Sequence, residues 1–420
     1  MFLGFSLGTQ SPQLKSSKNL TTRTSISAPL MATTLRELDK KVLEARISDL
    51  FSMIWYVEHT GDSYGELNEM KVLLNMYFAC RYHLGERVCD ELFKMFNEVE
   101  FKGLLDASEK PKVICLRVNA LKTSRQRLRR TLLEKGVLIE PLSWTQDGLA
   151  ILIGSSHVHE TPEYLNGHCM FQDTRSFLTV MTLDPKENEK IVDVDGLGEG
   201  ATHIASLMNN RGSVQACAIV ESKEKLKAAC KLMGINIVKW YSGLQKLCDA
   251  LEKDPADKVL LDAPCSCSRT NKITRNCDSV TAPSTFSDVK WYAKLQKGHI
   301  LSVIDMVKPG GYIVYSTCSP MISENEAIIN YALKMRDVEV VDTGLELGYP
   351  GLNEFRGQKF QASFQKMRRF YPSTHGIDVC FIAKLKKRSN SKPKSKQGRV
   401  LKRRIASTDD KKEIKIRKLS

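Results

Sequence analysis

The sequence has no run of apolar residues that approaches the ~18 positions a helix needs to cross a bilayer. It carries no recognisable secretory signal and no Cys-x-x-Cys pair, and its 8 histidines are scattered along the chain. Its 12 cysteines are therefore expected to be reduced thiols and not a disulfide framework. These absences predict a protein with no membrane partner and no metal site.

Acidic residues are scarce at both ends of the chain. Residues 1–36 hold 4 basic residues and no acid, and residues 384–420 hold 16 basic residues against 3 acids. The body between them, residues 37–383, is close to neutral, with 43 basic and 45 acidic residues. We expect residues 1–36 and 386–420 to be disordered, because polar, charged segments bury too little apolar surface to fold.

The two ends point to different destinations. A basic tail such as residues 386–420 binds nucleic acid or serves as a nuclear address, although it can also be a solubilising tail without a partner. The first 30 residues are rich in Ser and Thr and lack acids, as organellar transit peptides do, and Met31 could equally be the effective start. A nuclear location and an organellar one both stay open, with the tail as the clearer signal.

Two regions precede the part of the chain that carries the chemistry. In residues 37–107, apolar residues recur three and four positions apart, which predicts amphipathic helices. In residues 108–180, a strand, a basic helix and a second strand suit a small α+β module that contacts RNA. Its cations either contact RNA or form only the solvated face of the helix; they are Arg117, Lys122, Arg125, Arg127, Arg129 and Arg130.

In residues 181–385, strands alternate with helices, which predicts an α/β domain with a Rossmann-like, doubly wound sheet. In such a sheet, the loops at the carboxyl ends of the strands line the ligand crevice. Seven strands are expected, at residues 191–195, 214–220, 235–240, 258–263, 311–316, 338–342 and 378–385.

A glycine-rich turn follows the first of these strands. It starts at Asp195 and brings Gly196, Gly198 and Gly200 to the beginning of a helix, where bare backbone can lie against a ligand. The next strand ends at Glu221, an acid placed to bind ribose hydroxyls. A glycine turn alone is weak evidence, because any tight turn favours glycine. Together with the acid it indicates a cofactor that contains adenosine.

Two further strands each lead into a loop with a cysteine. Residues 259–261 lead to Asp262 and then Cys265, and residues 312–315 lead to Cys318. The two loops can bring two thiols and a carboxylate to one edge of the sheet. Buried cysteine packing is the ordinary alternative for an isolated cysteine.

Such a group suits cytosine chemistry. Carbon 5 of cytosine is a poor nucleophile until a thiolate adds at carbon 6, after which it can take a methyl group from S-adenosyl-L-methionine. A free thiol has a pKa near 8.5, so the attacking cysteine needs local activation. Asp262 is the group available near ring nitrogen 3, where charge develops. A paired base must first be flipped out of its duplex.

Over residues 45–385 the sequence resembles the Nop/Sun (Fmu-like) family of RNA cytosine carbon-5 methyltransferases, and within it the nucleolar proliferation-antigen branch. The motifs that carry the resemblance are LRVNALKTSR, TPEYLNGHCMFQD, LLDAPCS, YSTCS followed by ENE, and RRFYPSTHGIDVCFIAKLKK. The resemblance implies that Cys318 is the nucleophile, that Cys265 assists product release and that Asp262 is the motif acid. It also implies an RNA-recognition-like module before the catalytic domain.

The resemblance is incomplete at the cofactor turn. The family pattern there is approximately Asp-x-Cys-Ala-Ala-Pro-Gly-Gly-Lys-Thr, whereas residues 193–202 lack the proline and the lysine and place Glu199 in the turn. Ser242 stands where a further cofactor motif usually has Asp, and Cys267 replaces a glycine. Two hypotheses follow. The first is an S-adenosylmethionine-dependent methyltransferase of ribosomal RNA, active in ribosome biogenesis in the nucleolus. The second is a catalytically weak or silent RNA-binding assembly factor of pre-ribosomal particles.

Overall fold

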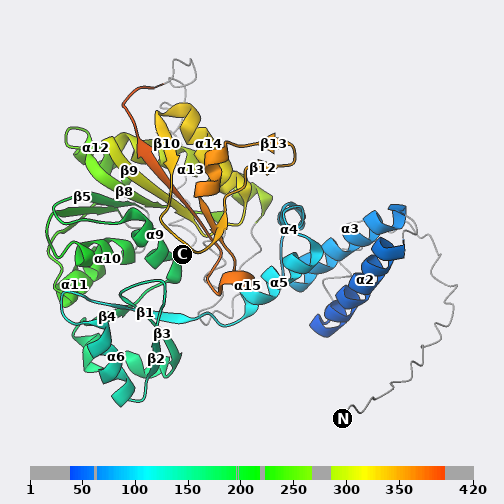
Figure 1. Cartoon of the computed structure of the whole chain (residues 1–420), viewed down its shortest axis with the longest axis horizontal. Coiled ribbons are helices and arrows are strands. Elements are labelled where there is room, and N and C mark those ends of the chain that lie inside the picture. The colour runs from blue at the N-terminus through cyan, green and yellow to red at the C-terminus, as the bar shows by residue number, and fades with distance from the viewer. Residues whose placement is uncertain are drawn as a thin grey trace, which may run out of the picture. The chain divides into compact units, whose positions relative to one another are not determined.

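The structure is a computed structural model that describes residues 38–60, 64–194, 196, 198–217, 223–266 and 285–392 (Figure 1). Its contacts divide the chain into two compact units, residues 1–81 and residues 82–420. The predictions for residues 1–36, for the tail beyond residue 392, and for Asp195 and Glu221 lie outside the described residues.

Two helices make up the described part of the first unit, α2 (Lys40–Thr60) and α3 (Tyr64–Arg81). The buried face of α2 is Leu43, Ile47, Leu50 and Ile54. These residues are three or four positions apart, so they lie on one side of the helix. The apolar spacing also allows Val42 to face the core, but Val42 is exposed and its neighbour Leu43 is buried. The side chain of Arg81 binds Glu44 at 2.7 Å and so joins the two helices.

Helices α4 (Glu86–Phe93) and α5 (Glu98–Glu109) open the second unit. A capping box fixes the start of α5: the Asn97 side chain accepts the backbone N–H of Glu100 at 2.8 Å. In return, the Glu100 carboxylate accepts the backbone N–H of Asn97 at 3.3 Å. This reciprocal bonding satisfies two of the backbone donors that a helix start leaves without partners.

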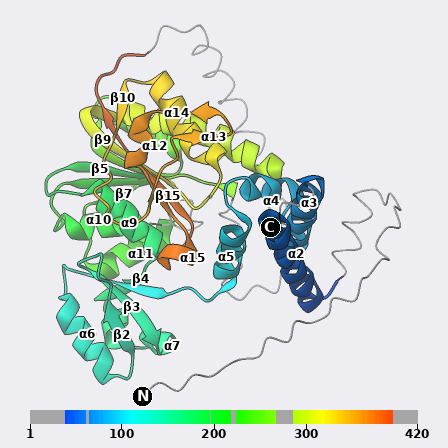
Figure 2. The ribbon, with the colours of Figure 1, turned by 45° about the vertical axis from the view of Figure 1, so that its right-hand side comes forward.

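A small module with its own sheet comes next. Its elements are β1 (Ile114–Val118), α6 (Arg125–Glu134), β2 (Leu138–Pro141), β3 (Gly148–Ile153), α7 (Ser155–Val158), α8 (Pro162–Leu165) and β4 (Cys169–Phe171). The strand order is β2-β3-β1-β4, and every pair is antiparallel. The βαββαβ sequence of elements is that of a split βαβ fold. In both views the module forms a separate lobe beside the large sheet (Figure 2).

The large α/β part, residues 181–387, is built on a nine-stranded sheet. Its strands are β5 (Lys190–Val194), β6 (Ser213–Cys217), β7 (Val238–Trp240), β8 (Ala256–Asp262), β9 (Val307–Thr317), β10 (Val338–Val341), β11 (Tyr349–Pro350), β14 (Arg368–Phe370) and β15 (Cys380–Lys387). Strands β7-β6-β5-β8-β9 are parallel in that order. β15 runs antiparallel to β9, and its other edge pairs with β14 and β10. The predicted α/β sheet is confirmed with each of its seven strands, and β11 and β14 extend it.

Helices cover both faces of this sheet. One face packs against α12 (Leu244–Leu251), α13 (Phe286–Met306) and α14 (Glu326–Met335). The other face packs against α9 (Thr174–Leu183), α10 (Glu199–Leu207) and α11 (Lys223–Met233). Successive strand residues alternate between the two cores, as the pleat of a strand requires: Val259 and Leu261 face the first core and Leu260 faces the second.

Short elements complete the C-terminal part. They are η2 (Ile322–Glu324), the hairpin of β12 (Glu354–Phe355) and β13 (Gln358–Lys359), η3 (Ala362–Lys366) and α15 (Pro372–His375). Within the described residues, no helix is long and apolar enough to cross a membrane.

Arg117 of β1 joins the small sheet to the start of α10. It is fully buried, and its guanidinium donates to Gln172 Oε1 at 2.6 Å, to the carbonyl of Glu199 at 2.8 Å and to Thr202 Oγ1 at 3.0 Å. Burial lowers the pKa of Arg117 to about 10. The arginine was predicted to contact RNA or to lie on a solvated helix face, and both interpretations are wrong: it is a structural cation inside the protein.

A buried histidine strengthens the same junction. His203 of α10 lies 2.6 Å from Asp147 of the small module, and its other ring nitrogen accepts Gln172 Nε2 at 2.9 Å. Burial lowers the pKa of His203. Burial would raise the pKa of Asp147, but the hydrogen bond to His203 brings it down to about 2. The small module is therefore fastened to the large α/β part by polar contacts.

The other basic residues of the module differ in their surroundings. Arg125 is half-buried and donates to the carbonyls of Leu142 and Thr145. Arg127 and Arg130 are exposed on α6. The two interpretations of these cations, RNA contact or solvated face, therefore apply to α6 and not to β1.

Arg117→Met should lower the free energy of unfolding by about 2–4 kcal/mol, because it leaves buried acceptors in the small module and on α10 without their donor. Urea denaturation followed by fluorescence measures the change. Arg130→Met removes the same charge from an exposed position and should change it by less than about 0.5 kcal/mol. Equal effects of the two variants would show that the Arg117 contacts contribute nothing to stability.

Candidate active site

The candidate site lies at the carboxyl ends of two neighbouring parallel strands. Asp262, the last residue of β8, is in register with Ser316 of β9, and Ser316 Oγ donates to Asp262 Oδ1 at 3.1 Å. The backbone N–H of Ala263 donates to the carbonyl of Ser316 at 2.8 Å. The two chains thus leave the sheet side by side, and the loops that follow start from fixed positions.

These loops bring the two predicted cysteines together. Cys265 and Cys318 are buried, and their sulfur atoms are 2.7 Å apart. The contact joins positions separated by 53 residues in the sequence. Asp262, Cys265 and Cys318 therefore form one group, as expected from the loops at this edge of the sheet.

Glu324 fastens the two cysteine loops to each other. Its carboxylate accepts the backbone N–H and the hydroxyl of Ser266, which follows Cys265, at 2.9 and 2.7 Å. It also accepts the hydroxyl of Ser319, which follows Cys318, at 2.5 Å, and Gln296 Nε2 at 3.1 Å. Burial raises the pKa of Glu324, and these hydrogen bonds oppose the rise.

The two residues after Glu324 extend this support. Asn325 accepts Thr317 Oγ1 at 2.6 Å and donates to the carbonyl of Ser319 at 2.7 Å. Glu326 forms a buried ion pair with Arg369 of β14, whose guanidinium also donates to the carbonyl of Pro320 at 2.9 Å. The Glu-Asn-Glu motif was noticed in the sequence without a role. The structure makes it the support of the Cys318 loop.

Arg175 is a member of the site that the sequence did not reveal. It lies in the first turn of α9, whose N-cap is Asp173, and its guanidinium forms an ion pair with Asp262. Burial raises the pKa of Asp262, and the Arg175 charge opposes the rise. The only sequence signal was its place two residues after the quoted motif that ends at Asp173.

The glycine turn begins α10. Gly198 has a φ of +90° and caps the helix, and a Cβ there would come within 2.4 Å of Leu226 Cδ2. A Cβ at Gly200 would lie 3.0 Å from the Asp193 carboxylate, and one at Gly196 would lie 3.4 Å from it. Only Gly198 is therefore required by both backbone conformation and space.

Glu199, the acid that interrupts the family pattern, is accommodated in this arrangement. Its carboxylate accepts the backbone N–H of Asp173 at the start of α9, at 3.3 Å. Burial raises the pKa of Glu199, and Asp173 adds to the rise. Ser242 is exposed and accepts Lys246 Nζ at 3.1 Å. Cys267 lies outside the described residues.

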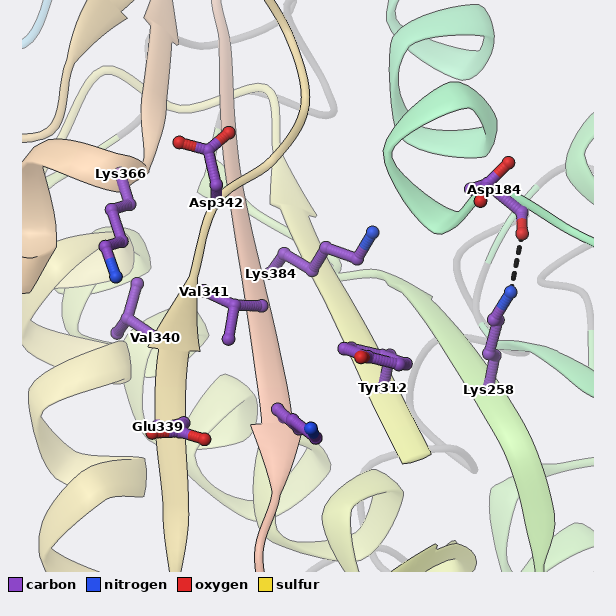
Figure 3. Close-up of a pocket in the computed structure, with 10 residues that line it drawn as sticks. Asp184, Lys258, Tyr312, Glu339, Val340, Val341, Asp342, Lys366 and Lys384 are labelled. Atoms are coloured by element: carbon purple, nitrogen blue, oxygen red, sulfur yellow. Dashed lines mark hydrogen bonds between the residues drawn. The ribbon is translucent and has the colours of Figure 1, made fainter. Parts of the chain in front are cut away.

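The structure also contains a hollow away from the cysteines. It measures about 450 Å³ and lies where β8 and β9 begin, lined by residues that include Lys258, Tyr312 and Lys384 (Figure 3). In the described ranges, no group of three or more His, Cys, Asp or Glu side chains is arranged to hold a metal ion.

Two family models match the chain. One, described as 16S rRNA methyltransferase RsmB/F, covers residues 180–386. The other, described as a ferredoxin-like domain of RsmF/B-like methyltransferases, covers residues 89–156. The second match agrees with the order of elements in the small module.

Individual relatives agree with these models. The chain is 40% identical over 343 residues to the human 28S rRNA (cytosine(4447)-C(5))-methyltransferase. The aligned region covers 79% of this chain and 41% of the human protein. It is 30% identical over 310 residues to the tRNA (cytosine(49)-C(5))-methyltransferase of Pyrococcus abyssi. This alignment covers 71% of this chain and 98% of the relative. The chain spans about half the length of the eukaryotic curated relatives it matches.

A solved structure shares the fold. A methyltransferase homolog from Pyrococcus horikoshii aligns with a TM-score of 0.66 and 30% identity, over 74% of this chain and 97% of that protein.

Glu324→Gln should loosen the contact between the two cysteine loops, because each carboxylate oxygen accepts two hydrogen bonds, whereas the amide has one oxygen and an NH2 group that cannot accept. We expect the free energy of unfolding to fall by about 1–3 kcal/mol. Bridging of Cys265 to Cys318 by dibromobimane should slow several-fold, as peptide mapping would measure. Glu346→Gln, at an exposed acid, is the control. An unchanged bridging rate in Glu324→Gln would contradict the role given to Glu324.

Proposed function

The chain belongs to the RsmB/F family of RNA cytosine-5 methyltransferases, and from that membership we propose that it transfers a methyl group to carbon 5 of cytosine in ribosomal RNA. One structural observation supports the proposal more than any other. Two thiols lie 2.7 Å apart on loops that leave the ends of adjacent parallel strands, one of which ends at the partly buried carboxylate of Asp262. Cysteines that only pack in a core need neither a neighbouring carboxylate nor a buried residue such as Glu324 that hydrogen-bonds both cysteine loops.

In the proposed reaction, the thiolate of Cys318 adds to carbon 6 of a cytosine that has been flipped out or is already unpaired. The addition makes carbon 5 nucleophilic, and S-adenosylmethionine, when bound, supplies the methyl group. Cys265, as a thiolate, then takes the proton from carbon 5. The electron pair of that bond forms the 5,6 double bond again, the carbon–sulfur bond breaks and Cys318 leaves as a thiolate. Cys265, in contact with the departing sulfur, assists this release.

The residues around the glycine turn fit the cofactor. Gly196, Gly198 and Gly200 form the turn that begins α10, and the N-terminus of a helix favours a negatively charged group. The carboxylate of Glu199 is held by the backbone of α9. We assign the cofactor to these three glycines, together with Asp262, Asp195 and Glu221.

RNA as the partner is supported by the relatives, which are methyltransferases of ribosomal or transfer RNA. The same relatives do not favour a silent assembly factor. We propose a nucleolar location and a pre-ribosomal substrate, in keeping with the eukaryotic relatives and with the basic composition of residues 384–420.

The cysteine roles can be separated by substitution. Cys318→Ala should lower methyl transfer to large-subunit ribosomal RNA by at least about 100-fold, because the covalent step is lost. Cys265→Ala should instead accumulate a methylated protein–RNA adduct, since release of Cys318 stalls. Labelled S-adenosylmethionine and denaturing gels measure both outcomes.

Cys248→Ala serves as the matched control, because Cys248 is a partly buried cysteine of α12 that is not part of the candidate site. It should methylate RNA at the unaltered rate. A Cys265→Ala protein that turned over normally and left no adduct would show that the cysteine roles are wrongly assigned.

A further inference from the structure

The ion pair between Arg175 and Asp262 determines which of the two side chains can donate a hydrogen bond to the cytosine ring. The pair comes from two elements, since Arg175 lies on α9 and Asp262 ends β8. The side chains are 14% and 23% exposed, so both are partly open to solvent. Cys318 is within electrostatic range of the guanidinium.

The proton of this contact belongs to the arginine. Burial disfavours the charged guanidinium, but Asp262 and Asp173 outweigh burial and raise the pKa of Arg175 well above its ordinary value. Asp262 therefore acts as the acceptor, with Ser316 donating to the same oxygen. Both contacts favour the ionised form of Asp262, against the burial that raises its pKa. An ionised carboxylate has no proton to donate to ring nitrogen 3, the task that the sequence suggested for Asp262.

Arg175 has donors to spare. A guanidinium carries five N–H groups in a flat fork, and one nitrogen of Arg175 is engaged by Asp262. A flat fork can bond two neighbouring acceptors at once. Ring nitrogen 3 and oxygen 2 of cytosine are such a pair, and both gain negative charge when a thiolate adds to carbon 6.

We propose that Arg175 is a catalytic residue, whose guanidinium donates to nitrogen 3 and oxygen 2 of cytosine while Asp262 holds it in place. The inference rests on the proposed function. As the Cys318 thiolate forms its bond to carbon 6, the π electrons of the 5,6 double bond move into the ring, and the charge spreads over carbon 5, nitrogen 3 and oxygen 2. Arg175 stabilises this charge without losing its proton, in the manner of an oxyanion hole.

Adduct formation in a Cys265→Ala background tests the role. Arg175→Met should lower its rate by about 100-fold or more, the usual cost of removing one such donor. Arg175→Lys, which keeps the charge but not the fork, should recover part of the rate. RNA affinity and the thermal unfolding midpoint should change little in Arg175→Lys. If the parental Cys265→Ala protein neither forms adduct nor methylates RNA, the proposed function fails; if it forms adduct and Arg175→Met forms adduct as fast, only the role of Arg175 fails.

The pH dependence separates Arg175 from Asp262 as the donor. If a protonated Asp262 donated, adduct formation would fall as pH rises through the pKa of that carboxyl, which burial raises. If Arg175 donates, the rate should rise with pH as the thiolate fraction of Cys318 increases, without that fall. The other ionisable groups facing the pair are Asp173, Glu199, Asp378 with its partner Lys112, Cys318 and Cys380. An alkaline fall that Asp262→Asn abolishes would overturn the proposal.

An independent observation concerns the hollow where β8 and β9 begin. Lys258, Tyr312, Lys386 and Glu339 are in register across four adjacent strands, so their side chains share one face of the sheet. Lys258 is four residues before Asp262, which places it about 13 Å from the catalytic end. The hollow therefore lies outside the active site.

The cations of the hollow are unequally engaged. Lys258 binds Glu189 at 2.9 Å, and Asp184 binds Lys186 at 2.7 Å. Lys384 lies over the Tyr312 ring at 5.3 Å (Figure 3), and Lys386 lies over the same ring at 5.8 Å. Neither lysine has a carboxylate within ion-pair distance among the described residues. The remaining charged residues that line the hollow are Lys366, Glu339 and Asp342. Burial lowers the pKa of Lys384, so an anion beside it would relieve an unfavourable environment.

We infer that this hollow binds the phosphodiester backbone of the RNA at a second position, away from the reacting base. The inference assumes the RNA partner proposed above. β15 ends at Lys387, so the chain leaves the sheet beside the hollow, and residues 384–420 carry 16 basic residues against 3 acids. The first lysines of the basic segment, Lys384 and Lys386, therefore line the hollow.

The salt dependence of RNA binding tests this site. In Lys384→Gln/Lys386→Gln, the slope of log K against log [salt] should flatten by about 0.7 for each lost phosphate contact. Adduct formation at saturating RNA should be unchanged, because the cysteines lie at the other end of the strands. The control Lys294→Gln/Lys334→Gln removes two exposed charges from α13 and α14. An unchanged slope in the first variant, or an equal change in the control, would overturn the inference.

Discussion

The parallel pairing of β8 with β9 is the constraint on which the candidate site depends. The register that places Asp262 beside Ser316 also fixes where each chain leaves the sheet. The two cysteine loops start from these exits, and their sulfur atoms meet after three and two further residues. A shift of one residue in this pairing would turn the side chains of one strand to the opposite face and separate the thiols. The apolar cores on both faces oppose such a shift, because each strand fills both of them.

Buried polar side chains hold the two cysteine loops in position beyond the end of the sheet. Glu324 bonds both cysteine loops, and Arg369 bonds Glu326 and the loop after Cys318. Each buried group has partners that offset the cost of leaving water. The environment is therefore rigid where two sulfur atoms must stay close, while Arg175 and Asp262 keep part of their surface exposed. Glu324 and Arg369 thus hold the loops in place, whereas Arg175 and Asp262 are the residues that solvent can reach.

Much of this arrangement could be predicted from the sequence, because it follows from local patterns. The strands are apolar runs bounded by turns, and the carboxyl ends of parallel strands meet at one edge. Those two facts were enough to bring Asp262, Cys265 and Cys318 together. Arg175 could not be found in this way: it is 87 residues from Asp262, on a helix that precedes the first strand of the sheet. Arg117 was misjudged because a basic residue in a strand does not show in its sequence which neighbour will cover it.

The buried position of Arg117 also bears on how the protein can be divided. The predicted boundary between the small module and the large α/β part, at residues 180 and 181, is crossed by hydrogen bonds from Arg117 and Asp147 to α10. A fragment that began at residue 181 would expose the Glu199 carbonyl, Thr202 and His203 at the very turn that we assign to the cofactor. The two regions therefore have separate sheets but share a buried set of hydrogen bonds. Joining either region to a different domain would require these hydrogen bonds to be replaced.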